Sequence, residues 1–240
     1  MFNFDYSNFE IWLLTVLFFI FRYLFLAGIF FFIFYKWKKK KLFVFKLQPN
    51  FPSKLQIKKE ILYSIITFLI YSTGIWAFLY WTKHEMTKQY VDLDGYGLIY
   101  YTLSIVIMFL IHDTYFYWTH RLMHHPRIFK FVHRIHHTFD NPTPWTSFAF
   151  HPFEAIISIG IIPIIIFTIP YHQTALIIFV TGLTFNNIII HLGYELPDPM
   201  KSNKYRNTAL DHDLHHNGII KNYGLYFNFW DKLMGTFQRG

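Results

Sequence analysis

Histidine is the residue type whose spacing in this sequence most directly suggests chemistry. The chain has 240 residues and 14 histidines, and more than half of the histidines lie between His112 and His151. Three short motifs carry eight of them: HRLMH at 120–124, HRIHH at 133–137 and HDLHH at 212–216. Residues three and four apart share one face of a helix, so each motif is predicted to present its imidazoles in one direction. Imidazoles grouped in this way form a metal-ligand set.

The number of histidines indicates more than one metal. A catalytic zinc ion takes three protein ligands and a water, so the eight motif histidines together with His191 exceed what one metal can use. We therefore expect two metals. Imidazole suits iron, zinc, copper and nickel, and ligand type alone does not choose among them. The sequence has no cysteine, which excludes thiolate ligands and a cysteine nucleophile in this chain.

Composition predicts that the motifs belong to a membrane protein. Hydrophobic residues make up 53% of the chain, charged residues 15%, and the mean hydropathy is +0.25, which leaves too little polar surface for an ordinary soluble domain. Residues 11–35, 61–81 and 96–118 are apolar and long enough to cross a hydrocarbon core of about 30 Å. The first run is too long for a signal peptide and no basic region precedes it, so we interpret it as a membrane span.

A further apolar region at 155–190 is divided by Pro170. At about 1.5 Å per residue its first arm reaches only ~21 Å, which is short for a crossing. This region is predicted to form a helical hairpin that enters the bilayer and returns to the same side, with two mismatched full spans as the alternative. Just before it, Pro142 and Pro144 end the preceding helical pattern, and His151 followed by Pro152 predicts the start of a new helix.

Charge predicts the orientation. The loop between the first two spans is rich in lysine, whereas the ten residues before the first span have no lysine or arginine, so the loop and all three motifs are expected in the cytosol. Basic loops near anionic headgroups also account for the net charge of +8. The predicted fold is an all-α integral membrane helical bundle with three full spans and a helical hairpin, and a cytosolic histidine-rich helical cap holding a dimetal site. We expect one membrane-embedded domain over residues 1–240, with the histidine motifs in 112–236.

Four segments of the chain resemble the fatty acid hydroxylase and sterol desaturase superfamily of integral-membrane di-iron enzymes. They are HDTYFYWTHRLMHHPRIFKFVHRIHH, NPTPWTSFAFHP, IHLGYELP and HDLHHNGIIKNYGLYFNFWDKLMGT, and together they extend from residue 112 to residue 236. The second segment is more similar to sterol C-5 desaturases than to the methyl-oxidising branch. By position, the resemblance implies nine metal ligands: His120, His124, His133, His136, His137, His191, His212, His215 and His216.

Two other residues are candidate catalytic groups. Asp113 lies two helical turns before His120, where its carboxylate could accept a proton from a ligand imidazole. The alternative is an ion pair with Arg121 or Arg134. His151 resembles a family position near the reaction centre, and its alternatives are a helix-capping or substrate-facing role and metal binding.

The remaining histidines are expected to play smaller parts. His112 could join the ligands. His125 follows His124 and points about 100° away from it on a helix, so we interpret it as a spectator. His84 and His172 fall in connecting segments and receive no catalytic role.

The resemblance implies an oxygenase that uses two irons, with zinc as a substitute after purification. Such an enzyme hydroxylates or desaturates an unactivated C–H position of a lipid with dioxygen and two external electrons. The sequence contains no dinucleotide or flavin motif, so a separate electron-donor protein is expected, either cytochrome b5-like or a ferredoxin with its reductase. Arg127, Lys130, Arg134 and Lys221 could dock an acidic donor, or they could simply be solvated charges.

Alternative functions fit the residues less well. A zinc-dependent membrane hydrolase would use similar ligands, but the HExxH motif with its glutamate base is absent from the sequence. A metal-binding or transport protein would be expected to place His or Asp within its spans. The sequence leaves open the identity of the lipid, and the choice between hydroxylation and desaturation.

Overall fold

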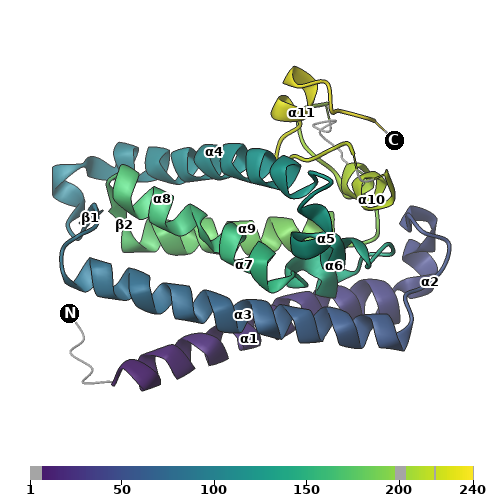
Figure 1. Ribbon diagram of the computed structural model, residues 1–240, viewed down its shortest axis with the longest axis horizontal. Coiled ribbons are helices and arrows are strands. Elements are labelled where there is room, and N and C mark those ends of the chain that lie inside the picture. Colours follow the sequence, from purple (N-terminus) through teal and green to yellow (C-terminus); the bar gives the residue numbers. More distant parts are fainter. Residues whose placement is uncertain (1–6, 198–203, 219, 240) are drawn as a thin grey trace.

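Four long helices form the body of the molecule and lie along a common direction (Figure 1). The coordinates are a computed structural model, which describes residues 7–197, 204–218 and 220–239. The long helices are α1 (Asn8–Phe31), α3 (Lys54–Lys83), α4 (Gly97–Met123) and α9 (Gln173–Ile190). Each is long and apolar enough to cross a membrane.

The three predicted spans coincide with α1, α3 and α4, which confirms the all-α membrane bundle. A π-helical turn, η1 (Phe32–Trp37), continues α1 to the lysine-rich segment. There the chain turns through α2 (Lys39–Leu42) and η2 (Phe43–Phe45) before α3 begins. Ser53 caps α3 by accepting a hydrogen bond from the backbone N–H of Gln56, which satisfies one of the free donors at that helix end.

The region around Pro170 folds as a helical hairpin, as predicted. Its first arm is α7 (Pro152–Ile159) followed by α8 (Ile161–Thr168), and its second arm is α9. The turn, strand β2 (Tyr171–His172), pairs in parallel with β1 (Gln89–Tyr90) in the connection between α3 and α4. The hairpin turn therefore lies level with that connection, at the end of the bundle opposite the histidine motifs, and α9 is itself long and apolar enough to cross a membrane, which fits the alternative of two full spans.

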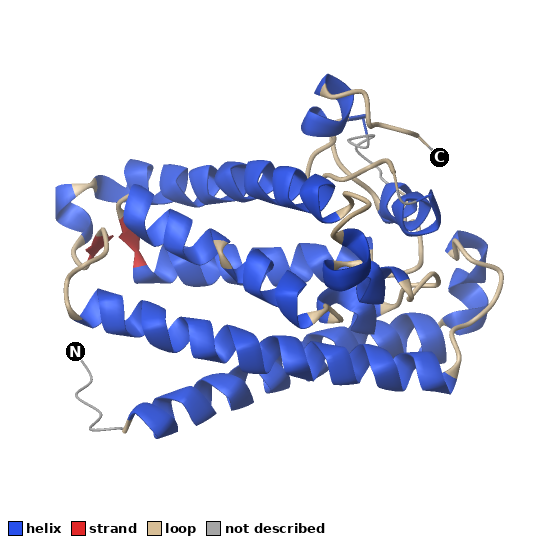
Figure 2. Ribbon diagram, in the orientation of Figure 1, coloured by secondary structure: helices blue, strands red, loops and turns tan. Residues whose placement is uncertain are grey.

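The two ends of the bundle differ in character (Figures 1 and 2). The short strands and the 3₁₀ turn η3 (Leu93–Gly95) lie at one end. At the other end lie α5 (Phe129–Val132), α6 (Arg134–His137) and α10 (Ala209–Gly218). A last short helix, α11 (Phe229–Leu233), packs against α4. All three histidine motifs are thus carried to the same end of the bundle.

A buried 3₁₀ segment, η4 (Pro144–Phe148), fills the space between α1, α3 and α9. Its aromatic side chains join those of Tyr23 and Phe68 in one core cluster. The carboxylate of Glu60, on α3, accepts hydrogen bonds from the hydroxyl groups of Thr143 and Thr146 at 2.7 and 3.0 Å. These bonds satisfy polar groups that burial would otherwise leave unpaired, and they fix the segment against α3.

Candidate metal centre

All nine histidines predicted as ligands come together in the structure, and they form two groups. Within each group the candidate ligand nitrogens lie within 4.8 Å of one another. The five-histidine group contains His120, His124, His133, His137 and His215. The four-histidine group contains His136, His191, His212 and His216. The groups adjoin, because the rings of His137 and His216 stack with centroids 4.8 Å apart.

The motifs divide between the groups according to helical spacing. Pairs four residues apart stay together, as His133 and His137 do in the five-histidine group. His136, three positions after His133, belongs instead to the four-histidine group. The HDLHH motif repeats the pattern, with His212 and His216 in one group and His215 in the other. The expectation that each motif points its imidazoles in one direction is therefore wrong for the second and third motifs, which each serve both groups.

Different elements supply the nitrogens of the five-histidine group. His120 and His124 end α4, and His215 comes from α10. The Nε2 atoms of His120 and His133 lie 3.0 Å apart, and those of His124 and His137 lie 3.1 Å apart. Nitrogens about 2.0–2.1 Å from a metal and at right angles to each other are about 3 Å apart, so these spacings match adjacent ligands of one ion.

The four-histidine group is centred on His191, at the carboxyl end of α9. The Nε2 atom of His191 lies 2.9 Å from that of His212 and 3.2 Å from that of His136. The Nε2 atoms of His212 and His216 are 3.2 Å apart. The Nδ1 atom of His191 donates to the carbonyl oxygen of Asn187 at 2.8 Å, which leaves Nε2 as the ligand atom.

The opposite ring nitrogens of three histidines in the five-histidine group each lie beside an oxygen atom. The Nδ1 atom of His120 donates to the carbonyl oxygen of Tyr223 at 2.8 Å, and that of His215 donates to the carbonyl of Lys221 at 2.6 Å. The Nδ1 atom of His133 faces Glu154 at 2.8 Å. Such partners fix the tautomer and orientation of ligand imidazoles.

The donor pattern fits a cation. His120 donates its Nδ1–H to the carbonyl of Tyr223, and the carboxylate of Glu154 lies 2.8 Å from Nδ1 of His133, so neutral rings with the proton on Nδ1 turn two Nε2 lone pairs toward each other. Two lone pairs held 3.0 Å apart repel each other unless a positive charge lies beside them. Imidazole nitrogens in this number fit iron or zinc.

Burial keeps the clustered imidazoles neutral, as metal ligation requires. Seven of the nine, all except His124 and His137, are at most 4% exposed. Loss of solvation lowers the pKa of His137 to about 4 and that of His191 to about 4. Burial likewise places the pKa of His133 well below its ordinary value, with the other histidines adding to the effect.

The predicted role of Asp113 is not supported by its contacts. Its Oδ1 accepts hydrogen bonds from the backbone N–H groups of Tyr226 and Phe227, at 3.0 and 3.2 Å. It therefore neither faces a ligand imidazole nor pairs with an arginine in these contacts. Instead it ties the segment after α10 to α4, and that segment carries the Tyr223 carbonyl that holds His120.

Two carboxylates that sequence reasoning did not assign hold the site instead. Glu154 contacts His133, as described above. Asp231 accepts from the backbone N–H groups of Tyr223 and Gly224 at 2.8 and 2.7 Å. Neither residue lies at a helical spacing from a histidine motif, so the sequence offered no local signal for either contact.

The other histidines lie outside both groups. His151 caps α7, its Nδ1 accepting from the backbone N–H of Phe153 at 3.2 Å, which matches the capping alternative. His112 is buried, and its Nδ1 lies 2.8 Å from the hydroxyl of Tyr226. His125 and His84 are exposed. The ring of His172 caps α9 at the far end of the bundle.

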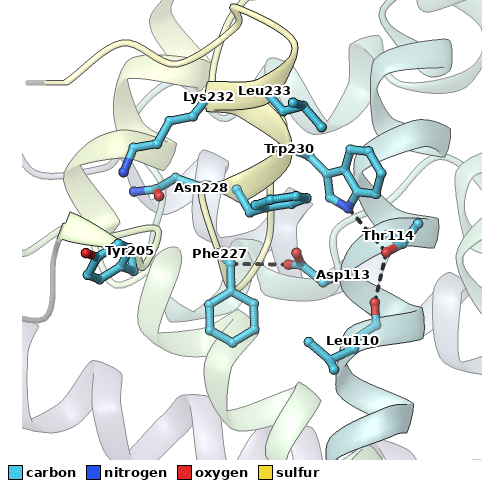
Figure 3. Close-up of a pocket in the computed structure, with 10 residues that line it drawn as sticks. Leu110, Asp113, Thr114, Tyr205, Phe227, Asn228, Trp230, Lys232 and Leu233 are labelled. Carbon is cyan, nitrogen blue, oxygen red and sulfur yellow. Dashed lines mark hydrogen bonds between the residues drawn. The ribbon is translucent and has the colours of Figure 1, made fainter.

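An apolar pocket of about 710 Å³ lies between α4 and the C-terminal segment (Figure 3). Leu110 and Thr114 form one wall, and Phe227 and Trp230 form another. The indole N–H of Trp230 donates to the Thr114 hydroxyl at 3.2 Å across it. None of the nine clustered histidines lines this pocket, so it is separate from the metal centre.

Comparison with known proteins gives a consistent result. The family model described as fatty acid hydroxylase matches residues 105–236. Delta(7)-sterol 5(6)-desaturase ERG3B of Gibberella zeae is 30% identical over 76% of this chain and 56% of its own length. Lathosterol oxidase of Homo sapiens is 29% identical over 77% of this chain and 62% of its own. Methylsterol monooxygenase 1 of Rattus norvegicus is 35% identical over 57% of this chain and 47% of its own.

These alignments span about half of each relative, from 47% to 62% of the three sequences. No solved structure matches the chain. The matched family region, 105–236, contains every member of the two histidine groups.

Proposed function

The chain belongs to the fatty acid hydroxylase family, and from that premise we propose that it is a membrane di-iron oxidoreductase acting on a lipid. The reaction would be hydroxylation or desaturation of an unactivated C–H position. The observation that carries the proposal is the division of nine histidines into adjoining groups of five and four, each compact enough for one metal ion. The nine members of these groups are the proposed ligands.

Two iron ions bound there would supply the oxidising chemistry, with dioxygen and two external electrons. Two protons complete each turnover, so that oxygen leaves in the alcohol and one water, or in two waters when a double bond forms. The side chains of this chain orient the ligand nitrogens and exclude bulk water. The buried rings and the acceptors on their Nδ1 atoms make the site rigid before substrate arrives.

The substrate is proposed to be a sterol or a related apolar lipid. Relatives named for sterol reactions support this class, and the apolar bundle beneath the histidines suits a substrate drawn from the membrane. The histidine end is proposed to face the cytosol, because the lysine-rich segment at α2 lies at that end.

Electrons are proposed to come from a separate cytochrome b5-like protein, or from a ferredoxin and its reductase. Arg127, Lys130, Arg134 and Lys221 are all exposed and flank the second and third motifs. Such a basic surface would favour the approach of an acidic donor. High salt should therefore slow electron transfer.

The test is product formation by the full-length protein in lipid bilayers, with a reductant, under oxygen and under nitrogen. Lipid mass spectrometry of cells with and without the gene names the substrate, because the product gains one oxygen atom or loses two hydrogen atoms. The proposal expects product only under oxygen. Equal product without oxygen would exclude an oxygenase and favour a metal-dependent hydrolase.

A further inference from the structure

We infer that Glu154 is a positioning residue of the metal centre, holding His133 in the tautomer that a metal requires. The inference rests on the proposed dimetal function and adds to it a residue outside the nine histidines. It concerns a carboxylate on α7, a helix of the hairpin that contributes no ligand of its own.

The contact between the two side chains is short and shielded from water. The Oε1 atom of Glu154 lies 2.8 Å from Nδ1 of His133, and the side chains are 5% and 2% exposed. A carboxylate has no proton to donate, so its oxygen at this distance favours the ring form that carries the proton on Nδ1 over the form that carries it on Nε2. Nε2 then carries the lone pair, and it points into the five-histidine group, 3.0 Å from Nε2 of His120.

The sequence HPFE at 151–154 places the carboxylate of Glu154 beside His133. His151 caps α7 through its side chain, Pro152 occupies the first turn, and Glu154 follows within the same turn. An acidic side chain there lies near the positive end of the helix, which offsets part of the cost of burying its negative charge. The cap, the proline and the glutamate thus act as one unit that fixes the entry of α7 beneath the second histidine motif.

Neighbouring helices hold α7 in place. The hydroxyl of Tyr71, on α3, lies 2.6 Å from the hydroxyl of Ser158. The hydroxyl of Tyr115, on α4, donates to the carbonyl oxygen of Ile157 at 2.5 Å. Because these contacts hold α7 against α3 and α4, the position of Glu154 is fixed. We infer that Glu154 in turn restricts the orientation of the His133 ring, which lies at the junction of the short helices α5 and α6.

Glu60 provides a matched comparison. It is fully buried like Glu154, but its carboxylate accepts from Thr143, Thr146 and Gln56 and contacts none of the nine histidines among its hydrogen bonds. Glu60→Gln removes the same charge and changes the hydrogen-bonding groups in the same way as Glu154→Gln. Unlike Glu154, however, Glu60 has no ligand imidazole among its hydrogen-bond partners.

The experiment is Co²⁺ titration of the full-length protein after removal of its metal by a chelator, comparing wild type with Glu154→Gln, Glu154→Met and Glu60→Gln. Loss of a partner on a ligand imidazole typically costs 10–100-fold in metal affinity. We expect wild type to bind two Co²⁺ ions, Glu154→Gln to bind one of them about 10-fold more weakly and Glu154→Met about 100-fold more weakly. Glu60→Gln should retain both affinities, and the visible Co²⁺ absorption should shift only in the Glu154 variants.

A double-mutant cycle separates positioning from general destabilisation. In a His133→Ala background, Glu154→Gln should have no further effect on Co²⁺ affinity, because the residue through which it acts is gone. Thermal unfolding of the metal-free proteins checks folding, and the near-isosteric Gln variant decides the matter if Glu154→Met does not fold.

The outcomes distinguish failure of the inference about Glu154 from failure of the proposed dimetal function. Wild type that binds two ions, with Glu154→Gln binding both equally well, would overturn the role of Glu154 alone. The same holds if Glu60→Gln weakens binding as much, or if the Glu154→Gln effect persists without His133. Wild type that binds fewer than two ions would overturn the dimetal proposal and the inference with it.

Discussion

His120 and His133 face each other through their Nε2 atoms at 3.0 Å, while the carbonyl of Tyr223 accepts from Nδ1 of His120 and the carboxylate of Glu154 lies 2.8 Å from Nδ1 of His133. Thirteen residues apart in the chain, they are brought together by the turn between α4 and α5. In neutral rings this arrangement opposes two lone pairs inside a buried site, which is unfavourable by itself. A bound cation removes the repulsion, so the folded state and the metal should stabilise each other.

Metal removal should therefore lower the thermal stability of the protein. Metal binding at each site stabilises the folded state by about 2.7 kcal/mol when the concentration of free metal is 100 times the Kd of that site. Elemental analysis of purified protein should give two metals per chain, as iron or partly as zinc, and chelation should lower the Tm. A reproducible content of one metal, with the third motif dispensable, would contradict this expectation.

His124 and His125 are adjacent in the chain, but we expect their substitution by alanine to have very different effects on activity. His124→Ala removes a member of the five-histidine group and should reduce activity at least 100-fold, because an incomplete set of ligands misplaces the metal. His125→Ala changes an exposed ring whose Nδ1 accepts only from the backbone N–H of Arg127, and should leave activity within about two-fold. The readout is oxygen-dependent product per folded protein. Equal losses in the two variants would mean that the grouping does not mark the ligands.

The histidine motifs could be found from sequence because each is a local pattern. Spacing of three and four residues within a motif reports a shared helical neighbourhood, and eight of the nine histidines in the two groups lie in such motifs. Which metal each residue serves depends on the way separate helices meet. Neighbours such as His136 and His137 diverge into different groups because adjacent residues on a helix point about 100° apart.

The contacts of the carboxylates Asp113 and Glu154 could not be predicted from local sequence patterns. Asp113 had the right spacing from His120 along one helix, but its oxygen is occupied by backbone amides of a segment more than 110 residues later. Glu154 reaches His133 from another helix, after a turn through η4. A contact between helices leaves no periodicity in the sequence, so only the packed structure reveals it.

Gly193→Ala should destabilise the fold near the four-histidine group. Gly193 ends the turn after His191 with a φ of +73°, and an added Cβ would meet the hydroxyl of Tyr35 and, at 2.6 Å, the carbonyl oxygen of Pro142. Left-handed backbone costs a non-glycine residue about 1–2 kcal/mol, and overpacking typically adds about 1–3 kcal/mol. We expect a lower Tm and weaker metal binding.

The matched control for that substitution is Gly95→Ala. A Cβ at Gly95 meets no atom within 4 Å. This variant should unfold within about 0.5 kcal/mol of wild type, as surface changes usually do. A Gly193→Ala protein as stable as the Gly95→Ala protein would show that the turn after His191 can relax without cost.

The last prediction concerns the side of the membrane on which the histidines lie. Lys88 is exposed and belongs to the connection that pairs with the hairpin turn, at the end of the bundle away from α6 and α10. Lys38 and Lys221 are exposed, and both belong to the histidine end, because Lys38 precedes α2 directly and the carbonyl of Lys221 accepts from Nδ1 of His215. The lysine-rich segment should remain in the cytosol, so a cysteine at position 88 should react with an impermeant thiol reagent in intact cells. Cysteines at 38 and 221 should react only after the cells are opened, and the absence of native cysteine removes any background from this chain. Labelling of position 38 or 221 from outside, with position 88 protected, would reverse the orientation and place the proposed electron donor on the opposite side.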